Sequence, residues 1–253
     1  MPSLAAAVLG RAGLDPAAYR AAPLNRRVAA CLRLLRTDDA DLAVRRLEAA
    51  PVSTGATLST LLIGVSAFFR DAAVFDTLRQ VVLPTLGRDG TPPRILSVGC
   101  SYGPELYSVA MLLAEQGRLD GAQLVGVDCR DDAVAAARSG MFGAETLDGL
   151  DEERRRRHLD PVPGGWRIAE RLRRATSWAR LDATAEVPAG PWDLVLCRNL
   201  TIYLTPSAGD ALHRRLVATL SPGGYFVVGK AERPAAALRL TQVARCVHRS
   251  HVD

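Results

Sequence analysis

An apolar segment, a glycine-bearing turn and a helix start follow one another without a gap in residues 94–108. The segment 95–98 (ILSV) suits a buried parallel strand, and Gly99 permits a sharp turn with close approach of the backbone to a ligand. Pro104 is favourable at the first position of a helix, and apolar residues then recur at helical spacing over 106–114. This stretch predicts the strand, loop and helix of an α/β fold, with a nucleotide bound at the loop.

The loop suits a nucleoside better than phosphates. Gly99 and Gly103 are four residues apart, which does not match G-x-G-x-x-G, and no Lys-Ser/Thr pair follows as in a P-loop. A second apolar segment, residues 123–127, ends on Asp128, at roughly the separation from the glycines at which an acidic residue binds ribose hydroxyls. A ribose recognised without phosphates favours S-adenosylmethionine as the cofactor. An α/β domain without a ligand is the alternative.

The chain before this unit is expected to be helical. Residues 1–85 carry apolar residues at helical spacing, with a break at 37–39 (TDD), where an N-cap would start a new helix. Residues 87–93 are turn-forming and predict a boundary. We therefore expect a helical N-terminal domain, residues 1–86, and a ligand-binding domain, residues 87–253.

The later elements follow from the same periodicities. We expect a helix that Asp131 or Asp132 caps and that ends near Arg138, and a helix over 147–159 with Asp148 or Asp151 near its start. We also expect a hairpin pairing 166–168 with 176–178, a strand at Trp192–Cys197, a helix over 207–220 and a strand over 225–228.

Charge is unevenly distributed. The formal net charge is only +5, but residues 154–180 hold nine arginines against Asp160 and Glu170. Such a segment attracts an acidic partner, or is a solvated helix face. Nucleic acid is an unlikely partner because no base-stacking aromatic residues are interleaved with these arginines.

The five cysteines are an odd number, lie far apart and form no C-x-x-C pair, so neither disulfides nor a zinc site is expected and a cytoplasmic location fits. Cys246, His248 and His251 have no evident fourth metal ligand, and no metal is expected. The apolar run at 4–9 is too short to span a membrane and lacks a preceding basic region. We expect neither a signal peptide nor membrane insertion.

Three segments in register resemble the CheR family of chemotaxis-receptor glutamate methyltransferases. Residues 66–71 (SAFFRD) resemble T-x-F-F-R-[DE], residues 100–108 (CSYGPELYS) resemble C-S-T-G-E-E-P-Y-S, and residues 197–203 (CRNLTIY) resemble C-R-N-V-x-I-Y. Residues 137–140 (ARSG) match a further family stretch. The similarity covers nearly the whole chain. It implies an α/β fold with a Rossmann-like class I methyltransferase sheet, helices on both faces, a small all-helical N-terminal domain and a short basic β insert at about 150–180.

The resemblance implies transfer of a methyl group from S-adenosylmethionine to a carboxylate. The acceptor would be an acidic protein, most simply a receptor that is methylated on glutamate, or a small-molecule carboxylate. Arg70 and Tyr203 would be the catalytic residues, with Arg70 also near the methionine part of the cofactor. Asp128 would hold the ribose and Asp182 the adenine. The full cofactor-binding set would be Ser66, Arg70, Gly99, Ser101, Glu105, Asp128, Cys129, Asp182, Asn199 and Leu200.

The chain departs from the family pattern at three positions. Pro104 stands where the first of two acids is usual, Gly64 where an Asn is usual, and Asp182 where an Asn is usual. The ribose end of the pocket is retained and the methionine end altered. Two alternatives therefore stay open: a CheR-like enzyme acting on a small molecule or on S-adenosylmethionine itself, for example by cyclisation with release of methylthioadenosine, and a non-catalytic module that senses the cofactor.

Overall fold

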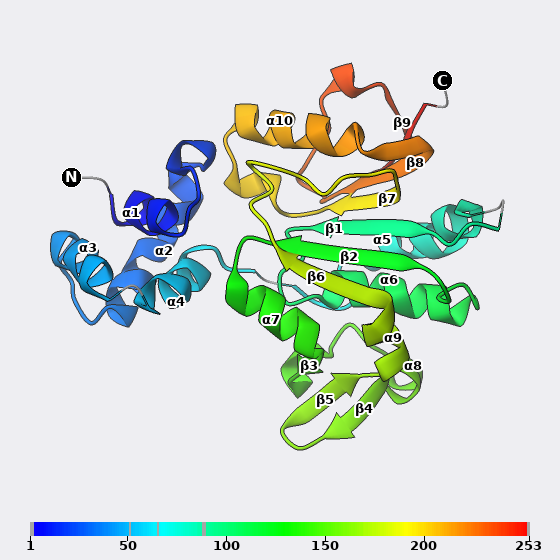
Figure 1. Ribbon diagram of the computed structural model, residues 1–253, viewed down its shortest axis with the longest axis horizontal. Helices are drawn as coiled ribbons and strands as arrows, with labels where there is room; N and C mark the ends of the chain where they lie inside the picture. Colours follow the sequence, from blue (N-terminus) through cyan, green and yellow to red (C-terminus); the bar gives the residue numbers. More distant parts are fainter. Residues whose placement is uncertain (1–2, 51, 65, 88–89, 252–253) are drawn as a thin grey trace.

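The computed structural model describes residues 3–50, 52–64, 66–87 and 90–251. A seven-stranded mixed sheet runs through the molecule, with a group of helices beside it and a small insert below it in the view of Figure 1. The strand order is β6-β2-β1-β7-β8-β10-β9. The bounds are β1 (Arg94–Val98), β2 (Gln123–Asp128), β6 (Thr176–Arg180), β7 (Trp192–Cys197), β8 (Leu220–Val228), β9 (Leu240–Ala244) and β10 (Val247–Ser250). The predicted α/β fold is confirmed.

The order of the strands fixes where a ligand can bind. β1 pairs in parallel with β2 on one side and with β7 on the other, so the chain changes direction across the sheet at β1. Ligands of open α/β sheets bind outside the carboxyl ends of the strands at such a switch point. The loops that follow β1, β2 and β7 therefore meet at one edge.

The helices that follow these strands hold the loops in place. α6 (Pro104–Glu115) and α7 (Asp131–Ser139) pack against β2 and β6, and α10 (Pro206–Val217) packs against β8. Gly103, which caps α6, has φ +94°, and a Cβ there would lie 2.8 Å from the Trp178 ring, so glycine is required. The caps predicted for α7 are wrong: its N-cap is Arg130, without a side-chain cap, and Asp131 and Asp132 lie inside the first turn.

The N-terminal segment is helical, as predicted. Its α-helices are α1 (Leu4–Arg11), α2 (Ala21–Leu34), α3 (Ala40–Ala49) and α4 (Val52–Leu61), and they lie together at the left of Figure 1. Asp39 caps α3 by accepting from the amides of Asp41 and Leu42, which confirms the expected break. The short α5 (Ala72–Thr77) follows near the sheet. The domain division at residue 86 stays a prediction, and Arg88 and Asp89 of the predicted boundary lie outside the described residues.

The N-terminal helices are attached to the sheet at its carboxyl edge. Tyr19 and Leu204 form an isolated antiparallel bridge, and the Arg20 amide donates to the Tyr203 carbonyl at 2.8 Å.

In the described part of the chain, no helix is long and apolar enough to cross a membrane.

The structure of the insert differs from two of the predictions. Its sheet has the order β3-β5-β4, formed by β3 (Met141–Phe142), β4 (Leu159–Val162) and β5 (Gly165–Ile168), with α8 (Glu152–His158) and α9 (Glu170–Ala175) beside it. The predicted helix over 147–159 is therefore shorter, and Asp151 caps it. The predicted pairing of 166–168 with 176–178 is wrong, because Pro163 and Gly164, with φ +85° at Gly164, form a two-residue turn that pairs β5 with β4.

Residues 176–178 belong instead to β6, the edge strand of the large sheet, which runs parallel to β2. Trp178 lies over Gly126 of β2, where a Cβ would be only 2.4 Å from its ring. This close packing places the strand in the large sheet. The predicted strand over 225–228 is also longer than expected, since β8 begins at Leu220.

Candidate functional site

Two adjoining pockets lie at the carboxyl ends of β1, β2 and β7. Their volumes are about 170 Å³ and 70 Å³. Ten predicted site residues line one or both: Ser66, Arg70, Gly99, Ser101, Glu105, Asp128, Cys129, Asn199, Leu200 and Tyr203. Asp182 does not; it lines a separate hollow with Asp15 and Thr184, where its Oδ1 accepts from the Thr184 amide and hydroxyl. The fold thus brings three distant motifs together at one place.

Asp128, the last residue of β2, lies in the smaller pocket and is 7% exposed. Its Oδ2 accepts from the Ser101 amide at 2.8 Å. Its Oδ1 accepts from the Arg130 amide at 3.0 Å and from Arg130 Nε at 3.2 Å. The carboxylate is therefore held rigidly at the strand end.

The loop after β1 brings backbone against this carboxylate. Gly99 has φ +68° and Ser101 φ +52°, and the Gly99 amide donates to the Val127 carbonyl at 2.8 Å. A Cβ at Gly99 would meet Leu200 Cδ2 at 3.3 Å. The left-handed conformation and the close approach of Leu200 together explain the glycine.

A chain of ion pairs centred on the buried Arg198 closes the other end of the site. Glu105 accepts from the Ser97 hydroxyl at 2.9 Å and from Arg198 Nη1 at 3.0 Å. Arg198 Nη2 donates to Asp71 Oδ2 at 2.8 Å, and Lys230 pairs with the other oxygen of Asp71. Burial raises the pKa of Asp71, but the Lys230 hydrogen bond and the Arg198 charge outweigh it, so the pKa is lowered.

Arg70 lines the larger pocket beside this network, and its carbonyl accepts from Arg198 Nη2 at 2.9 Å. The two preceding aromatic residues, Phe68 and Phe69, are packed in the core. Phe68 contacts Phe142 at a ring distance of 4.9 Å, and the Phe69 amide donates to the Ser108 hydroxyl at 3.0 Å. The packed phenylalanines therefore fix the backbone that presents Arg70.

The loop after β7 is held by Glu232, which sequence reasoning missed. Glu232 is 3% exposed and accepts four hydrogen bonds: from the amides of Asn199, Thr201 and Gly229 and from the Thr201 hydroxyl, at 2.7 to 2.8 Å. Asn199 has φ +59° and faces both pockets. The available signal was an acid four residues after the end of a buried strand, which is weaker than the one for Asp128, the last residue of its strand at a suitable separation from the glycines.

Two tyrosines line the site, Tyr19 from the N-terminal segment and Tyr203 from the loop after β7. The Tyr203 hydroxyl donates to the Ile63 carbonyl at 3.3 Å. Tyr19 lines the smaller pocket, and burial, with Cys129, Asp182 and Asp128 nearby, raises its pKa. Sequence reasoning missed Tyr19, because helical periodicity in residues 1–85 carries no information on which side chain reaches the sheet. It also missed Arg130 and Arg198. Arg130 contacts Asp128, two residues before it, and the distant Ser101. Arg198 contacts Asp71 and Glu105, which are both distant in the chain.

No three His, Cys, Asp or Glu side chains cluster as metal ligands in the described residues. All five cysteines are free thiols. Burial, followed by the Asp128 charge, raises the pKa of Cys129 to about 12, so its thiol lines the smaller pocket as a neutral group.

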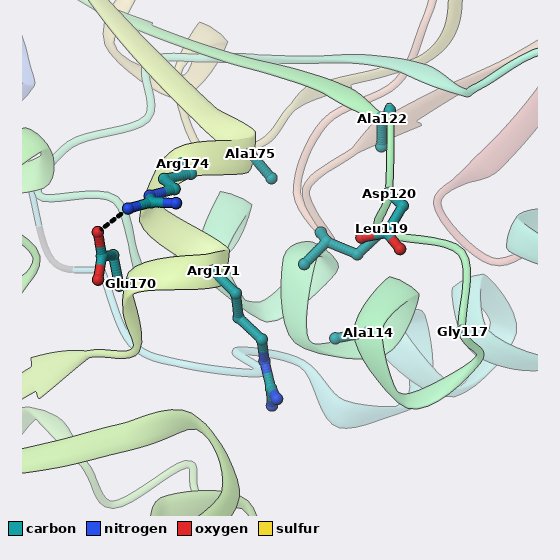
Figure 2. A pocket seen from close by; sticks show the side chains of 10 residues that line it. Ala114, Gly117, Leu119, Asp120, Ala122, Glu170, Arg171, Arg174 and Ala175 are labelled. Carbon is teal, nitrogen blue, oxygen red and sulfur yellow. Dashed lines mark hydrogen bonds and ion pairs between the residues drawn. The ribbon is translucent and has the colours of Figure 1, made fainter.

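A larger hollow of about 700 Å³ lies between the end of α6 and α9, at the amino ends of β2 and β6, and none of the predicted site residues lines it. Figure 2 shows Glu170 paired with Arg174, while Arg171 extends away from that pair. Because the carboxyl edge of the sheet holds the convergent polar groups, we place the functional site there.

A mixed sheet with parallel central strands, an acid at the end of β2 and a tight glycine turn after β1 define a nucleoside-binding α/β domain of the class I methyltransferase kind. The profile described as "CheR methyltransferase, SAM binding domain" matches residues 64–248. The chain belongs to the CheR methyltransferase family, and the matched part is its S-adenosylmethionine-binding domain.

Curated relatives agree with this family. The chain is 32% identical over 231 residues to the "Probable biofilm formation methyltransferase WspC" of Pseudomonas aeruginosa, covering 88% of this chain and 54% of that protein. It is 34% identical over 176 residues to "Chemotaxis protein methyltransferase 1" of the same organism. It is 33% identical over 178 residues to "Chemotaxis protein methyltransferase Cher2" of Pseudomonas putida. Each of these two alignments covers 65% of this chain and 64% of the relative. The chain thus spans between half and two thirds of these relatives.

The residues present suit S-adenosylmethionine. Asp128 keeps one carboxylate lone pair without a partner among the described residues, and the Gly99 turn allows close approach of a nucleoside. The two pockets adjoin, and Ile63 and Gly64 are among the residues that line both.

Proposed function

We propose that this chain methylates a carboxylate with S-adenosylmethionine, and that the acceptor is a glutamate side chain of a chemoreceptor-like protein. The observation that carries the proposal is the pocket in which Arg70 and Tyr203 meet the loops of β1 and β7. The names of the relatives, which include chemotaxis methyltransferases, support the same acceptor.

The main task of the protein in this reaction is to align the acceptor carboxylate with the methyl group of the cofactor. A glutamate carboxylate is ionised at neutral pH and is already nucleophilic, so no strong base is required. S-adenosylmethionine supplies a methyl group on a positively charged sulfur. Arg70 would hold the acceptor carboxylate bidentately, which places its oxygen for an in-line approach.

Tyr203 would orient the same carboxylate. Its hydroxyl donates to the Ile63 carbonyl at 3.3 Å, which is a long hydrogen bond, so that it can exchange this partner for the acceptor. Asp128, Gly99 and Asn199 would hold the cofactor. Closure of the N-terminal segment over the pocket would exclude water.

The basic insert is a candidate contact for an acidic receptor. Arg156, Arg167 and Arg171 are exposed on it, which favours approach of a negatively charged partner. A cytoplasmic location fits the free thiols. We also propose that residues 1–86 act as a separate helical domain that covers the site.

Incubation with S-adenosylmethionine labelled in the methyl group tests the function. Label on glutamate residues of a receptor protein, found by mass spectrometry, is expected. A labelled small product, or release of methylthioadenosine, would instead support the small-molecule or cyclisation alternative, and tight binding without any product would support a sensing module. Asp128→Ala should abolish cofactor binding, and calorimetry showing unchanged affinity would remove Asp128 from the ribose site.

A further inference from the structure

Arg130 is a buried cation in the wall of the smaller pocket, and the residue patterns did not identify it. It is 3% exposed, its Nε donates to Asp128 Oδ1 at 3.2 Å, and its Nη2 donates to the Ser101 hydroxyl at 3.1 Å. Its guanidinium lies 5.2 Å from the centre of the Tyr102 ring. Its Nη1 is buried and has no hydrogen-bond partner among the described residues.

An unpartnered buried guanidinium nitrogen needs an explanation, because leaving such a donor unpaired is costly. Asp128 does not satisfy it: its Oδ1 accepts from the amide and Nε of Arg130 and its Oδ2 from the Ser101 amide, while Nη1 makes none of these hydrogen bonds. A carboxylate offers about four acceptor directions, so one remains. A ribose presents two neighbouring hydroxyls, and only one of them can donate to Asp128.

Gly64 makes room for this arrangement. A Cβ at position 64 would lie 2.2 Å from the Ser101 hydroxyl oxygen and 2.6 Å from Arg130 Nη2. The Gly64 carbonyl accepts from the same Ser101 hydroxyl at 3.3 Å. The departure at position 64 is therefore matched to the arginine at position 130, whose guanidinium occupies the space beside it.

We propose that Arg130 is a ribose-binding residue: one ribose hydroxyl donates to Asp128, and the oxygen of the other accepts from the Arg130 guanidinium. The inference rests on the proposed function only in taking S-adenosylmethionine as the cofactor, and not in the choice of acceptor. It assigns the two hydroxyls to two different residues, where the sequence pointed to Asp128 alone.

Calorimetry on the full chain tests this with S-adenosylhomocysteine and its 2′-deoxy and 3′-deoxy analogues. The wild type is expected to bind each analogue about tenfold or more weakly than the parent, since each lost hydrogen bond involves a charged group. Arg130→Met is expected to bind the parent about tenfold more weakly and to become insensitive to the loss of one hydroxyl while remaining sensitive to the loss of the other. Arg138→Met, in the helix that Arg130 precedes and outside both pockets, should behave as the wild type.

Arg130→Lys keeps a positive charge beside Asp128 and should fold even where Arg130→Met does not, with the same loss of sensitivity to one hydroxyl. Equal sensitivity to both hydroxyls in a folded Arg130 variant would overturn the proposal, as would a wild type that tolerates the loss of either one. A wild type that does not bind S-adenosylhomocysteine would overturn the proposed function as well. Binding of the parent with unaltered discrimination in the variants would overturn the role of Arg130 alone.

Discussion

Arg198 and Glu105 form a buried ion pair, with Arg198 Nη1 3.0 Å from Glu105 Oε2, that joins the end of β7 to the first turn of α6. The Arg198 side chain is 1% exposed and the Glu105 side chain 14% exposed. Arg198 also pairs with Asp71, so that one side chain fixes the two loops beside the larger pocket and the backbone of Arg70. The sequence placed Arg198 within a motif but did not show what it contacts.

Arg198→Met should lower the free energy of unfolding by about 3 kcal/mol, because it leaves Glu105 without its cation and Asp71 paired with Lys230 alone. Urea denaturation measures the change. Arg156→Met is the control, since Arg156 and Glu152 are 3.9 Å apart and largely exposed, and it should cost less than about 0.5 kcal/mol. Equal effects of the two substitutions would contradict a structural role for Arg198.

Glu232→Gln should both destabilise the fold, by about 2 kcal/mol or more, and weaken S-adenosylhomocysteine binding. Four donors point at the carboxylate, and an amide nitrogen in place of one oxygen would face donors instead of accepting from them. Denaturation and calorimetry measure the two effects. The exposed Glu186→Gln should change neither.

Arg70→Ala should lower kcat/KM for the carboxylate acceptor by about 10- to 100-fold, the value of a charge-assisted hydrogen-bonded contact. Affinity for S-adenosylhomocysteine should change by less than about threefold. Steady-state kinetics with varied acceptor concentration measure the effect on kcat/KM, and calorimetry measures the effect on S-adenosylhomocysteine affinity. An unchanged rate would leave Arg70 as a structural residue.

His213 should make the fold less stable in mild acid. It is 2% exposed, packs against Phe226, and has no hydrogen-bond partner on either ring nitrogen among the described residues. Burial lowers its pKa, although Glu232 and Asp210 act in the opposite direction. Below about pH 6.5 the unfolded chain takes up a proton that the folded chain does not, so the free energy of unfolding falls.

The slope from this one residue reaches at most about 1.4 kcal/mol per pH unit, and it ends where the folded imidazole itself protonates. Denaturation of the wild type and of His213→Leu between pH 5 and pH 8 should therefore show a shallower dependence in the variant. The exposed His251→Leu should keep the slope of the wild type. Parallel curves for the wild type and His213→Leu would show that His213 does not titrate differently on folding.

Local patterns were sufficient for the elements that carry the motifs. β1, β2 and β7 and the helix starting at Pro104 were predicted because buried parallel strands are short apolar runs and α6 begins with a favourable proline. The pairing of 166–168 with 176–178 was predicted wrongly, because alternation shows that a segment is extended but not which strand it joins. In the structure, residues 176–178 pair with β2, and Trp178 packs over Gly126 of that strand.

The sequence by itself determined the fold class, the family and ten of the residues that line the two pockets, since these follow from short motifs whose order is fixed in the chain. Only the tertiary structure decided what those residues contact. Arg130 against Ser101, Glu232 beneath Asn199 and Arg198 against Glu105 are contacts between segments distant in the chain. Their partners depend on which loops the sheet brings to one edge, and no local pattern encodes that.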